Sequence, residues 1–431
     1  MNPKSRILAS ALLATGLVAQ GSPLRAAGFS IFEQGTKAMG MAMAFTAQAD
    51  DPSAIFYNPG GVAFLDGQHF SLGLTVVTST EGDFKGANPS PGASARGEQE
   101  PLFETPPHFY WTRQINERWR FGLGLTSPFG LTTEWKNPDT FPGRYLSTKA
   151  ALRTFDLNPT LAWQATPKLG VGFGVLVRFS DVELERFAPQ RSPINGQLVN
   201  VGQVHLESDL NEGYGFTVGV LHKWNESFSW GLSYRSKVKV DYEGDGRFSQ
   251  ILTGLPPFDA AIARAIPFGQ DLPIKTNIEF PDSASLGLAF ALSATSKFEI
   301  DVNWTGWSSF DAVPLQFTEN PQFSQTLPEH WEDAMNYRLG FRWAQGATGE
   351  WRVGAYYDET PQPELYVSPL LPDANRTGLT LGWGHRFSTG KTLDLAVLYL
   401  PFDERKVRTN ANNFLGDYNT TAWLFGATFG L

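Results

Sequence analysis

Short and long breaks alternate along this chain, and that alternation limits the possible folds more than any other feature. Short polar breaks fall at 114–117, 165–168, 225–227, 294–296, 344–348 and 388–390. Long breaks rich in Gly, Pro and Asn fall near 81–107, 127–150, 188–206, 244–282, 309–332, 358–374 and 402–420. Six short and seven long breaks separate fourteen segments. Bacterial outer-membrane barrels have an even number of strands, tight periplasmic turns and long extracellular loops, and this pattern is typical of them.

The segments between the breaks have the period of two that is expected of β-strands. Segment 297–304 places Phe, Ile, Val and Trp at its even positions and Glu, Asp and Asn at 299, 301 and 303. The last segment repeats the pattern, with Trp423, Phe425 and Phe429 on one face. A soluble β-sandwich also alternates, so the period alone leaves both folds open. Aromatic residues at strand ends and an export signal favour an all-β transmembrane barrel.

Composition excludes several other classes of protein. Charged residues make up 18% of the chain, below the roughly 25% of soluble domains. No run reaches the roughly 18 consecutive apolar residues of a transmembrane helix. The absence of Cys excludes disulfides and thiol chemistry, and the net charge of -9 argues against a nucleic-acid partner.

The N-terminal region divides into an export signal and an apolar segment. Residues 1–27 fit a signal peptide, with Lys4 and Arg6 ahead of a short apolar stretch and small residues before the predicted cleavage site. Residues 28–61 are apolar and rich in Gly, Ala and Met, but they do not alternate. Such a segment has no obvious fold of its own. We therefore expect residues 28–67 to form a plug, or hatch, inside a barrel built from residues 68–431.

One long break contains a predicted helix. Residues 258–266 are good helix formers with apolar residues at helical spacing, preceded by Pro256 and Pro257 and followed by Pro267. A helix at the extracellular mouth could receive an apolar ligand, or it could simply cap the barrel by packing on other loops. The sequence leaves both interpretations open.

Several motifs in order resemble the FadL family of outer-membrane channels for long-chain fatty acids and other hydrophobic compounds, including its TodX-like branch for aromatic hydrocarbons. The resemblance covers essentially the whole mature chain. It rests on Gly28-Phe29, Asp50-Asp51, Asn58-Pro59, Ser127 to Trp135, Glu185 to Ala188, Asp301 to Trp307 and Leu371 to Arg376.

The resemblance implies a fourteen-stranded barrel whose lumen is closed by the N-terminal hatch. A hydrophobic ligand, such as a fatty acid, a detergent-like molecule or an aromatic hydrocarbon, would bind first among the loops and then in an apolar lumen pocket. It would leave sideways through a kink in the third strand, by diffusion and without a cofactor. The protein would lie in the outer membrane, in contact with lipid and lipopolysaccharide, as a monomer.

The same resemblance assigns the gate. Asn58 and Pro59 match an Asn-Pro-Ala hatch motif whose third residue is here Gly60, and they would form a bend near the wall gap. Gly130 matches the kink of the third strand, and Pro128 withholds a backbone N–H two residues earlier. These residues could alternatively form an ordinary turn and the start of a loop.

Ligand-binding residues follow by position. Arg186 matches an arginine that pairs with the ligand carboxylate in fatty-acid members, although a pair with Glu183 or Glu185 is the alternative. Phe29, Ile31 and Phe32 would line the pocket from the hatch side. Near Trp331 fatty-acid members often place a Lys, and this chain has Glu332. That departure leaves an uncharged ligand, such as an aromatic hydrocarbon, as the alternative.

Other functions find little support in the residues. The six histidines are scattered without metal-binding spacing, so no metal site is expected. The chain has no Gly-x-Ser-x-Gly motif, no phosphate-binding loop and no clear carboxylate pair, so we expect no enzyme. A general porin would be more polar inside and would not need the apolar plug of residues 28–61.

Overall fold

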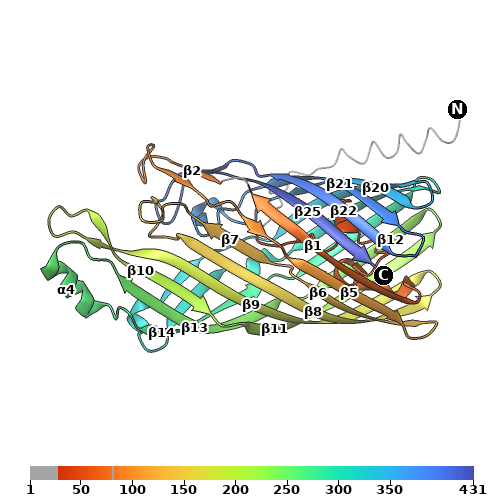
Figure 1. The fold of residues 1–431 in the computed structure, drawn as a ribbon, viewed down its shortest axis with the longest axis horizontal. Coiled ribbons are helices and arrows are strands. Elements are labelled where there is room, and N and C mark those ends of the chain that lie inside the picture. Colours follow the sequence, from red (N-terminus) through yellow and green to blue (C-terminus); the bar gives the residue numbers. More distant parts are fainter. Residues whose placement is uncertain (1–27, 80–81) are drawn as a thin grey trace.

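A computed structural model describes residues 28–79 and 82–431, so the predicted signal peptide lies outside the described residues. The described chain forms one elongated antiparallel β-barrel (Figure 1). Strand β1 (Gln68–Ser79) closes it by pairing with β25 (Thr421–Gly430) on one side and β5 (Pro107–Gln114) on the other. The wall has the fourteen strands that the break pattern predicted.

Many wall strands are interrupted, so that two elements follow one another along one strand of the barrel. After β1 the wall continues through β4 (Phe103–Glu104) and β5, β6 (Trp119–Thr126) and β7 (Gly130–Glu134), β8 (Lys149–Thr166), β9 (Leu169–Arg191), β10 (Leu198–Ser208) and β11 (Asn211–Asn225), and β12 (Phe228–Arg235) and β13 (Val238–Gln250). It is completed by β14 (Asp271–Phe280) and β15 (Ser283–Ala291), β16 (Ser296–Thr305) and β17 (Ala312–Phe317), β18 (Gln325–Pro328) and β19 (Ala334–Gln345), β20 (Gly349–Asp358), β21 (Arg376–Arg386), β22 (Thr392–Pro401) and β25.

Smaller elements lie inside the barrel and among the loops. The loops contribute a small sheet of β2 (Asp83–Gly86), β3 (Arg96–Glu98), β23 (Arg405–Val407) and β24 (Gly416–Asn419). Short helices are α2 (Thr36–Met39), α3 (Ala54–Tyr57), η2 (Pro59–Phe64), η3 (Trp307–Ser309), η4 (Pro321–Phe323) and η5 (Glu364–Tyr366). Helix α4 (Pro256–Ala265) confirms the predicted loop helix. No helix among the described residues is long and apolar enough to cross a membrane.

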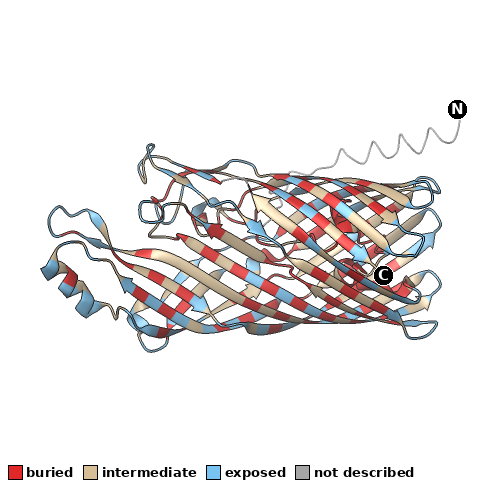
Figure 2. Cartoon of the chain, viewed as in Figure 1, coloured by how far each residue is buried: buried red, intermediate tan, exposed pale blue. Residues whose placement is uncertain are grey.

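The apolar face of each strand points outward. Trp423, Phe425 and Phe429 are exposed on the barrel exterior, whereas Glu299 and Asp301 are buried on the inward face of β16. Buried and exposed residues alternate along the strands in Figure 2. This inverted arrangement is what a lipid-facing barrel needs and a soluble sandwich does not have, so it decides between the two folds that the period left open.

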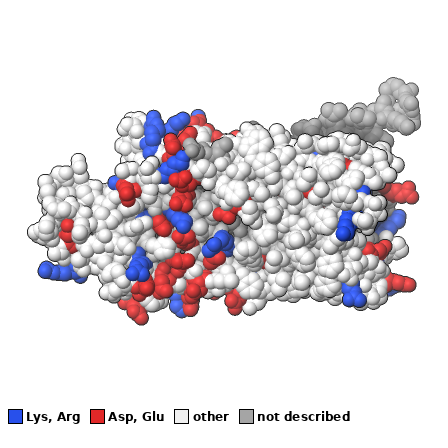
Figure 3. All heavy atoms as spheres, viewed as in Figure 1, with Lys and Arg blue, Asp and Glu red and all other residues white. Residues whose placement is uncertain are grey.

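Charged residues gather in a belt toward the end of the barrel that carries α4, and a largely uncharged band lies beside it (Figure 3). The belt contains ion pairs such as Lys149–Glu183 and Arg153–Asp181 on adjacent strands. The strands run further past this belt than the sequence suggested, because β9, β10, β13 and β14 extend into the predicted breaks at 188–206 and 244–282. The ladder continues in these regions, but its outward residues are polar. The break pattern therefore predicted loops there.

Candidate functional site

The N-terminal segment, residues 28–67, packs within the barrel as short helices and turns, and most of its residues are buried. Backbone groups in such an irregular segment need partners, because a buried unpaired N–H is costly. The wall supplies them: the N–H groups of Phe45 and Thr46 both donate to Asp301 Oδ2 at 3.0 Å. The N–H of Ala47 donates to the neighbouring Glu299. The inward acidic residues of β16 therefore hold the middle of the segment.

Asn58 ties the end of the segment to β11. Its Nδ2 donates to Thr46 O at 2.7 Å and to Val220 O at 3.0 Å, and its Oδ1 accepts from the N–H of Gly60 at 3.0 Å. The turn can approach the wall this closely because residues 172 and 219 are glycines. A Cβ at Gly172 would overlap Pro59, and a Cβ at Gly219 would overlap Asn58.

Gly60 is also explained by this close approach. A Cβ at Gly60 would lie 2.7 Å from the backbone nitrogen of Leu221, so an Ala at this position would require a shift of backbone against backbone. Asn58, Pro59 and Gly60 thus contact β9 and β11. A different part of the N-terminal segment contacts Pro128 and Gly130.

The third wall strand is broken between β6 and β7. Thr126 lies opposite Asp156 and Gly130 lies opposite Arg153, so the three residues 127–129 face only two residues of β8. This is a β-bulge, which bends a strand and interrupts its ladder. The interruption falls at Pro128 and Gly130, where the sequence predicts a kink.

The N-terminal segment supplies backbone partners at the kink. The N–H of Ile31 donates to Pro128 O at 2.8 Å, and the N–H of Gly130 donates to Phe29 O at 3.0 Å. The side chain of Gln34 exchanges hydrogen bonds with the backbone of Ser127, donating at 2.7 Å and accepting at 2.9 Å. Residues 29–31 therefore pair with the interrupted part of the wall through one isolated antiparallel bridge, Ser30 to Phe129, and Gln34 adds side-chain contacts.

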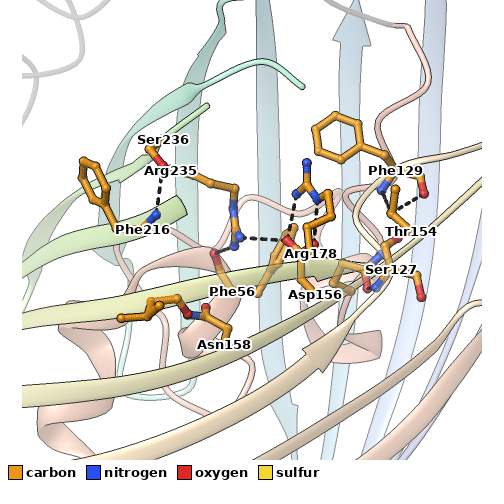
Figure 4. A network of polar contacts seen from close by, with 12 residues as sticks. Phe56, Ser127, Phe129, Thr154, Asp156, Asn158, Arg178, Phe216, Arg235 and Ser236 are labelled. Carbon is orange, nitrogen blue, oxygen red and sulfur yellow. Dashed lines mark hydrogen bonds and ion pairs between the residues drawn. The ribbon is translucent and has the colours of Figure 1, made fainter. Parts of the chain in front are cut away.

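Figure 4 shows the polar network behind the kink. Arg178 donates to both carboxylate oxygens of Asp156, at 2.7 and 2.8 Å, and Arg235 lies 3.5 Å from the same group. The Arg178 guanidinium lies over the rings of Phe129 and Phe280, at 4.5 and 4.6 Å from their centroids. The bidentate pair fixes the Arg178 guanidinium, whose cation–π contacts hold the bulged Phe129 beside Phe280.

A gap in the wall adjoins the kink. Strand β4 pairs with β1 and β7 pairs with β8, and no ladder joins β4 to β7 among the described residues. A cavity of about 390 Å³ occupies this gap. Its lining runs from Phe29 in the lumen to Phe155, which is exposed on the outward face. Thr132 Oγ1 donates to Glu104 Oε1 across it at 3.1 Å. We call this opening the window.

A second cavity, of about 80 Å³, lies in the lumen and has a mostly apolar lining. Its walls come from β8, β9, β13, β14 and the loops around residues 310 and 370. We call it the lumen pocket. Phe29 lines both cavities and stands between them. Its ring packs on Phe129, Phe280, Trp307, Phe310 and Trp331, with centroids 4.7 to 6.3 Å away.

The structure separates the other predicted ligand residues. Ile31 lines the window. Phe32 lies in neither cavity lining, and the guanidinium of Arg338 covers its ring at 4.7 Å. Arg186 follows Leu184 on the same face of β9, just outside the lining of the lumen pocket. It has no hydrogen bond or ion pair to another described residue, so it does not pair with Glu183 or Glu185.

Sequence reasoning missed several residues of the site. Asp373 accepts the N–H of Gly28 at 3.0 Å and so anchors the start of the described chain. Glu329 reaches the lumen pocket from the loop before β19. Asp373 stands in the Leu371 to Arg376 motif, which marked the position without indicating its partner. Glu329 carried no signal, because its burial depends on loops that fold over it.

One cluster among the described residues could hold a metal ion. It consists of Glu183, Glu185 and His205 on adjacent strands, whose ligand atoms lie within 4.8 Å of one another. Sequence spacing could not indicate this cluster, because β9 and β10 bring the residues together only in the sheet. Lys149 binds Glu183 at 2.8 Å and already balances part of the charge.

Comparison with known proteins gives one consistent result. Residues 17–431 match the family described as outer membrane protein transport protein (OMPP1/FadL/TodX). The chain is 25% identical over 432 residues to a long-chain fatty acid transport protein of Escherichia coli O6:H1, covering 94% of both chains. It is 25% identical over 459 residues to outer membrane protein P1 of Haemophilus influenzae, covering 95% of this chain and 94% of the other.

Solved structures show the same fold. A Pseudomonas aeruginosa FadL homologue superimposes with a TM-score of 0.82 at 20% identity, covering 94% of this chain and 99% of that one. The toluene transporter TodX of P. putida gives a TM-score of 0.69 at 19% identity, covering 95% and 99%.

Proposed function

We infer the function from one premise: the chain belongs to the OMPP1/FadL/TodX family of outer-membrane transport proteins. It is an outer-membrane β-barrel, and its family transports hydrophobic compounds. Members of this family are channels rather than enzymes. We propose that this protein takes up hydrophobic molecules passively. A ligand is captured among the extracellular loops, enters the lumen pocket, displaces the hatch at Phe29 and leaves through the window into the membrane.

The observation that carries this proposal is the position of Phe29, which lines both the lumen pocket and the window. Leu131 and Leu152 also line both cavities, so the two cavities adjoin, and Phe29 is the residue of the N-terminal segment at this junction. Phe29 and Ile31 are held at the kink by two backbone hydrogen bonds. Two such bonds contribute about 1–3 kcal/mol in total. A ligand that binds the displaced state better can therefore shift the population toward an open passage.

Lateral exit also suits the physical chemistry of an apolar cargo. Each CH₂ group kept out of water is worth about 0.8 kcal/mol. A molecule that moves from an apolar pocket into the bilayer through a side opening avoids the aqueous periplasm. A general porin gives the cargo no such advantage, and no enzymatic step is needed.

Replacing Gly130 by Val tests the exit route. A Cβ at Gly130 would lie 2.9 Å from Ile31 Cδ1, and the branched side chain would fill the window between the hatch and β7. We expect uptake of a radiolabelled apolar ligand to fall about tenfold, equivalent to about 1.4 kcal/mol. Ala427→Val adds similar bulk to the outward face of β25, away from the window, and should leave uptake unchanged. Normal uptake by Gly130→Val would argue for exit straight into the periplasm.

The ligand class divides the proposal into two versions. A fatty-acid channel would use Arg186, which lies unpaired one step from the lumen pocket, to meet the carboxylate. A channel for aromatic hydrocarbons or other uncharged molecules would need no cation. The second version is favoured by the pocket lining, because it includes Glu329 and does not include Arg186.

Arg186→Ala separates the two versions. If Arg186 binds a carboxylate, oleate binding should weaken about tenfold, a loss typical of a hydrogen bond to a charged group. Toluene binding should not change. Titration of the purified protein with each ligand measures both, and Arg186→Lys should retain part of the oleate affinity because it keeps the charge. Equal loss of both ligands in Arg186→Ala would point to a structural role.

We also propose that the belt of ion pairs meets the head groups of outer-leaflet lipid and lipopolysaccharide. Its outward position on β8, β9, β13 and β14 and its mixed charge support this contact. A single barrel closes its own sheet edges, which supports a monomer.

A further inference from the structure

One buried carboxyl group lines the mostly apolar lumen pocket. Glu329 lies in the loop between β18 and β19, is 5% exposed and lines the cavity with Leu152, Val182 and Ile278. A carboxyl group is seldom buried without a partner of opposite charge. Its position in a ligand cavity is therefore informative.

The loop holds this carboxyl group in place. The N–H of Glu329 donates to Asp311 O at 2.9 Å, and the indole N–H of Trp331 donates to Glu329 Oε2 at 3.1 Å. Its other oxygen, Oε1, makes no hydrogen bond with a described residue. One side of the carboxyl group is thus fixed by Trp331, and the other is available to an occupant of the pocket.

No described cation pairs with Glu329. The other titratable residues in the lining are Tyr242, whose hydroxyl donates to Ser180, and Glu207 and Glu243, whose side chains are mostly exposed and lie near His205 and Lys275. In the neighbouring loops His330 pairs with Asp311, and Asp333 accepts the N–H of Ser308.

Burial has a direct consequence for the charge of this group. It raises the pKa of Glu329 to about 8, against a smaller opposite effect of the Trp331 hydrogen bond. Below that pH the carboxyl group is protonated and can donate a hydrogen bond, and above it the group is an anion that can only accept one.

We propose that Glu329 is a specificity-determining residue that donates a hydrogen bond to an uncharged oxygen at one end of an otherwise apolar ligand. The ligand class is then apolar molecules with a carbonyl or similar acceptor, rather than carboxylates. This inference rests on the proposed function of the lumen pocket as the ligand site. A site built around a buried donor discriminates against analogues that cannot pair with it.

The same group connects the ligand to the gate. Trp331, which binds Glu329, packs on Phe29 with ring centroids 5.6 Å apart. An oxygen bound at Glu329 places the ligand beside the ring that separates the two cavities. The ligand's polar end would therefore sit at the part of the pocket where displacement of Phe29 opens the passage.

Two ligands of matched size test the proposal: methyl octyl ketone, which carries a hydrogen-bond acceptor, and decane, which does not. Their binding to the protein in lipid nanodiscs is measured by tryptophan fluorescence. At about pH 6.5 we expect the ketone to bind about tenfold more tightly than decane, a preference that falls at about pH 9.5 because Glu329 has lost its donor. Glu329→Gln, whose amide donates at both pH values, should keep the preference at both.

Glu329→Leu should lose the ketone preference at both pH values while still binding decane. Resistance of the folded barrel to unfolding in detergent, seen by gel migration, verifies that each variant is folded. An unchanged ketone preference in folded Glu329→Leu would overturn the role of Glu329 and leave the proposed function standing. Failure of the unaltered protein to bind either ligand would overturn both.

Discussion

A barrel lacking residues 28–60 is expected to conduct ions and small polar solutes as an open pore. These residues fill the lumen, and their removal exposes inward polar groups such as Asp301 and Arg338 that now face the segment. A polar lumen without a plug becomes a water-filled channel. Single-channel recordings in planar bilayers should show conductance at least about tenfold above the intact protein, in the range of open porin-like barrels.

The matched control removes a loop instead of the plug. Deleting residues 251–268, which include α4 beyond one end of the barrel, takes away chain outside the lumen (Figure 1). That variant should keep the low conductance of the intact barrel. If the variant without residues 28–60 is folded and equally silent, the segment is not what closes the lumen.

Closing the window with a chemical cross-link is expected to stop uptake. The chain has no Cys, so Glu104→Cys with Thr132→Cys introduces the sole pair of thiols. The two native side chains meet across the window at 3.1 Å, within reach of a short cleavable bifunctional reagent. Cross-linked protein should lose uptake at least about tenfold, because β4 and β7 can no longer part around a ligand.

Cleaving the reagent should restore the rate, and each single Cys variant treated in the same way should transport normally. Unchanged uptake through a fully cross-linked window would show that the cargo leaves by another path. Together with Gly130→Val, this experiment distinguishes a blocked exit from a disturbed hatch, since the cross-link does not touch residues 29–31.

The kink illustrates how far sequence reasoning reached in the site. Pro128 and Gly130 predicted a broken ladder, and the break is there, because a missing N–H and a missing side chain act locally. The partners that fill the break, Phe29 and Ile31, come from about a hundred residues earlier in the chain. Nothing in the local pattern indicates which segment completes the ladder.

Asn58 and Glu329 show where that reasoning ended. The resemblance predicts a bend at Asn58 and Pro59 near the wall gap, but their docking on β9 and β11 depends on glycines at 172 and 219 that lie opposite them only in the barrel. Glu329 reads as one more polar loop residue, yet it is buried because the loops around residues 310 and 370 cover the pocket that it faces.

The sequence by itself predicts the export signal. It also determined the number of strands and which face of each strand is apolar, since strand period and break length are properties of neighbouring residues. Only the tertiary structure decided that the apolar face points outward, which wall residues hold the N-terminal segment and where the wall opens. Those contacts join residues far apart in the chain, 256 residues between Phe45 and Asp301 and 345 between Gly28 and Asp373. Closure of the barrel brings such residues together, and no local pattern encodes which of them then meet.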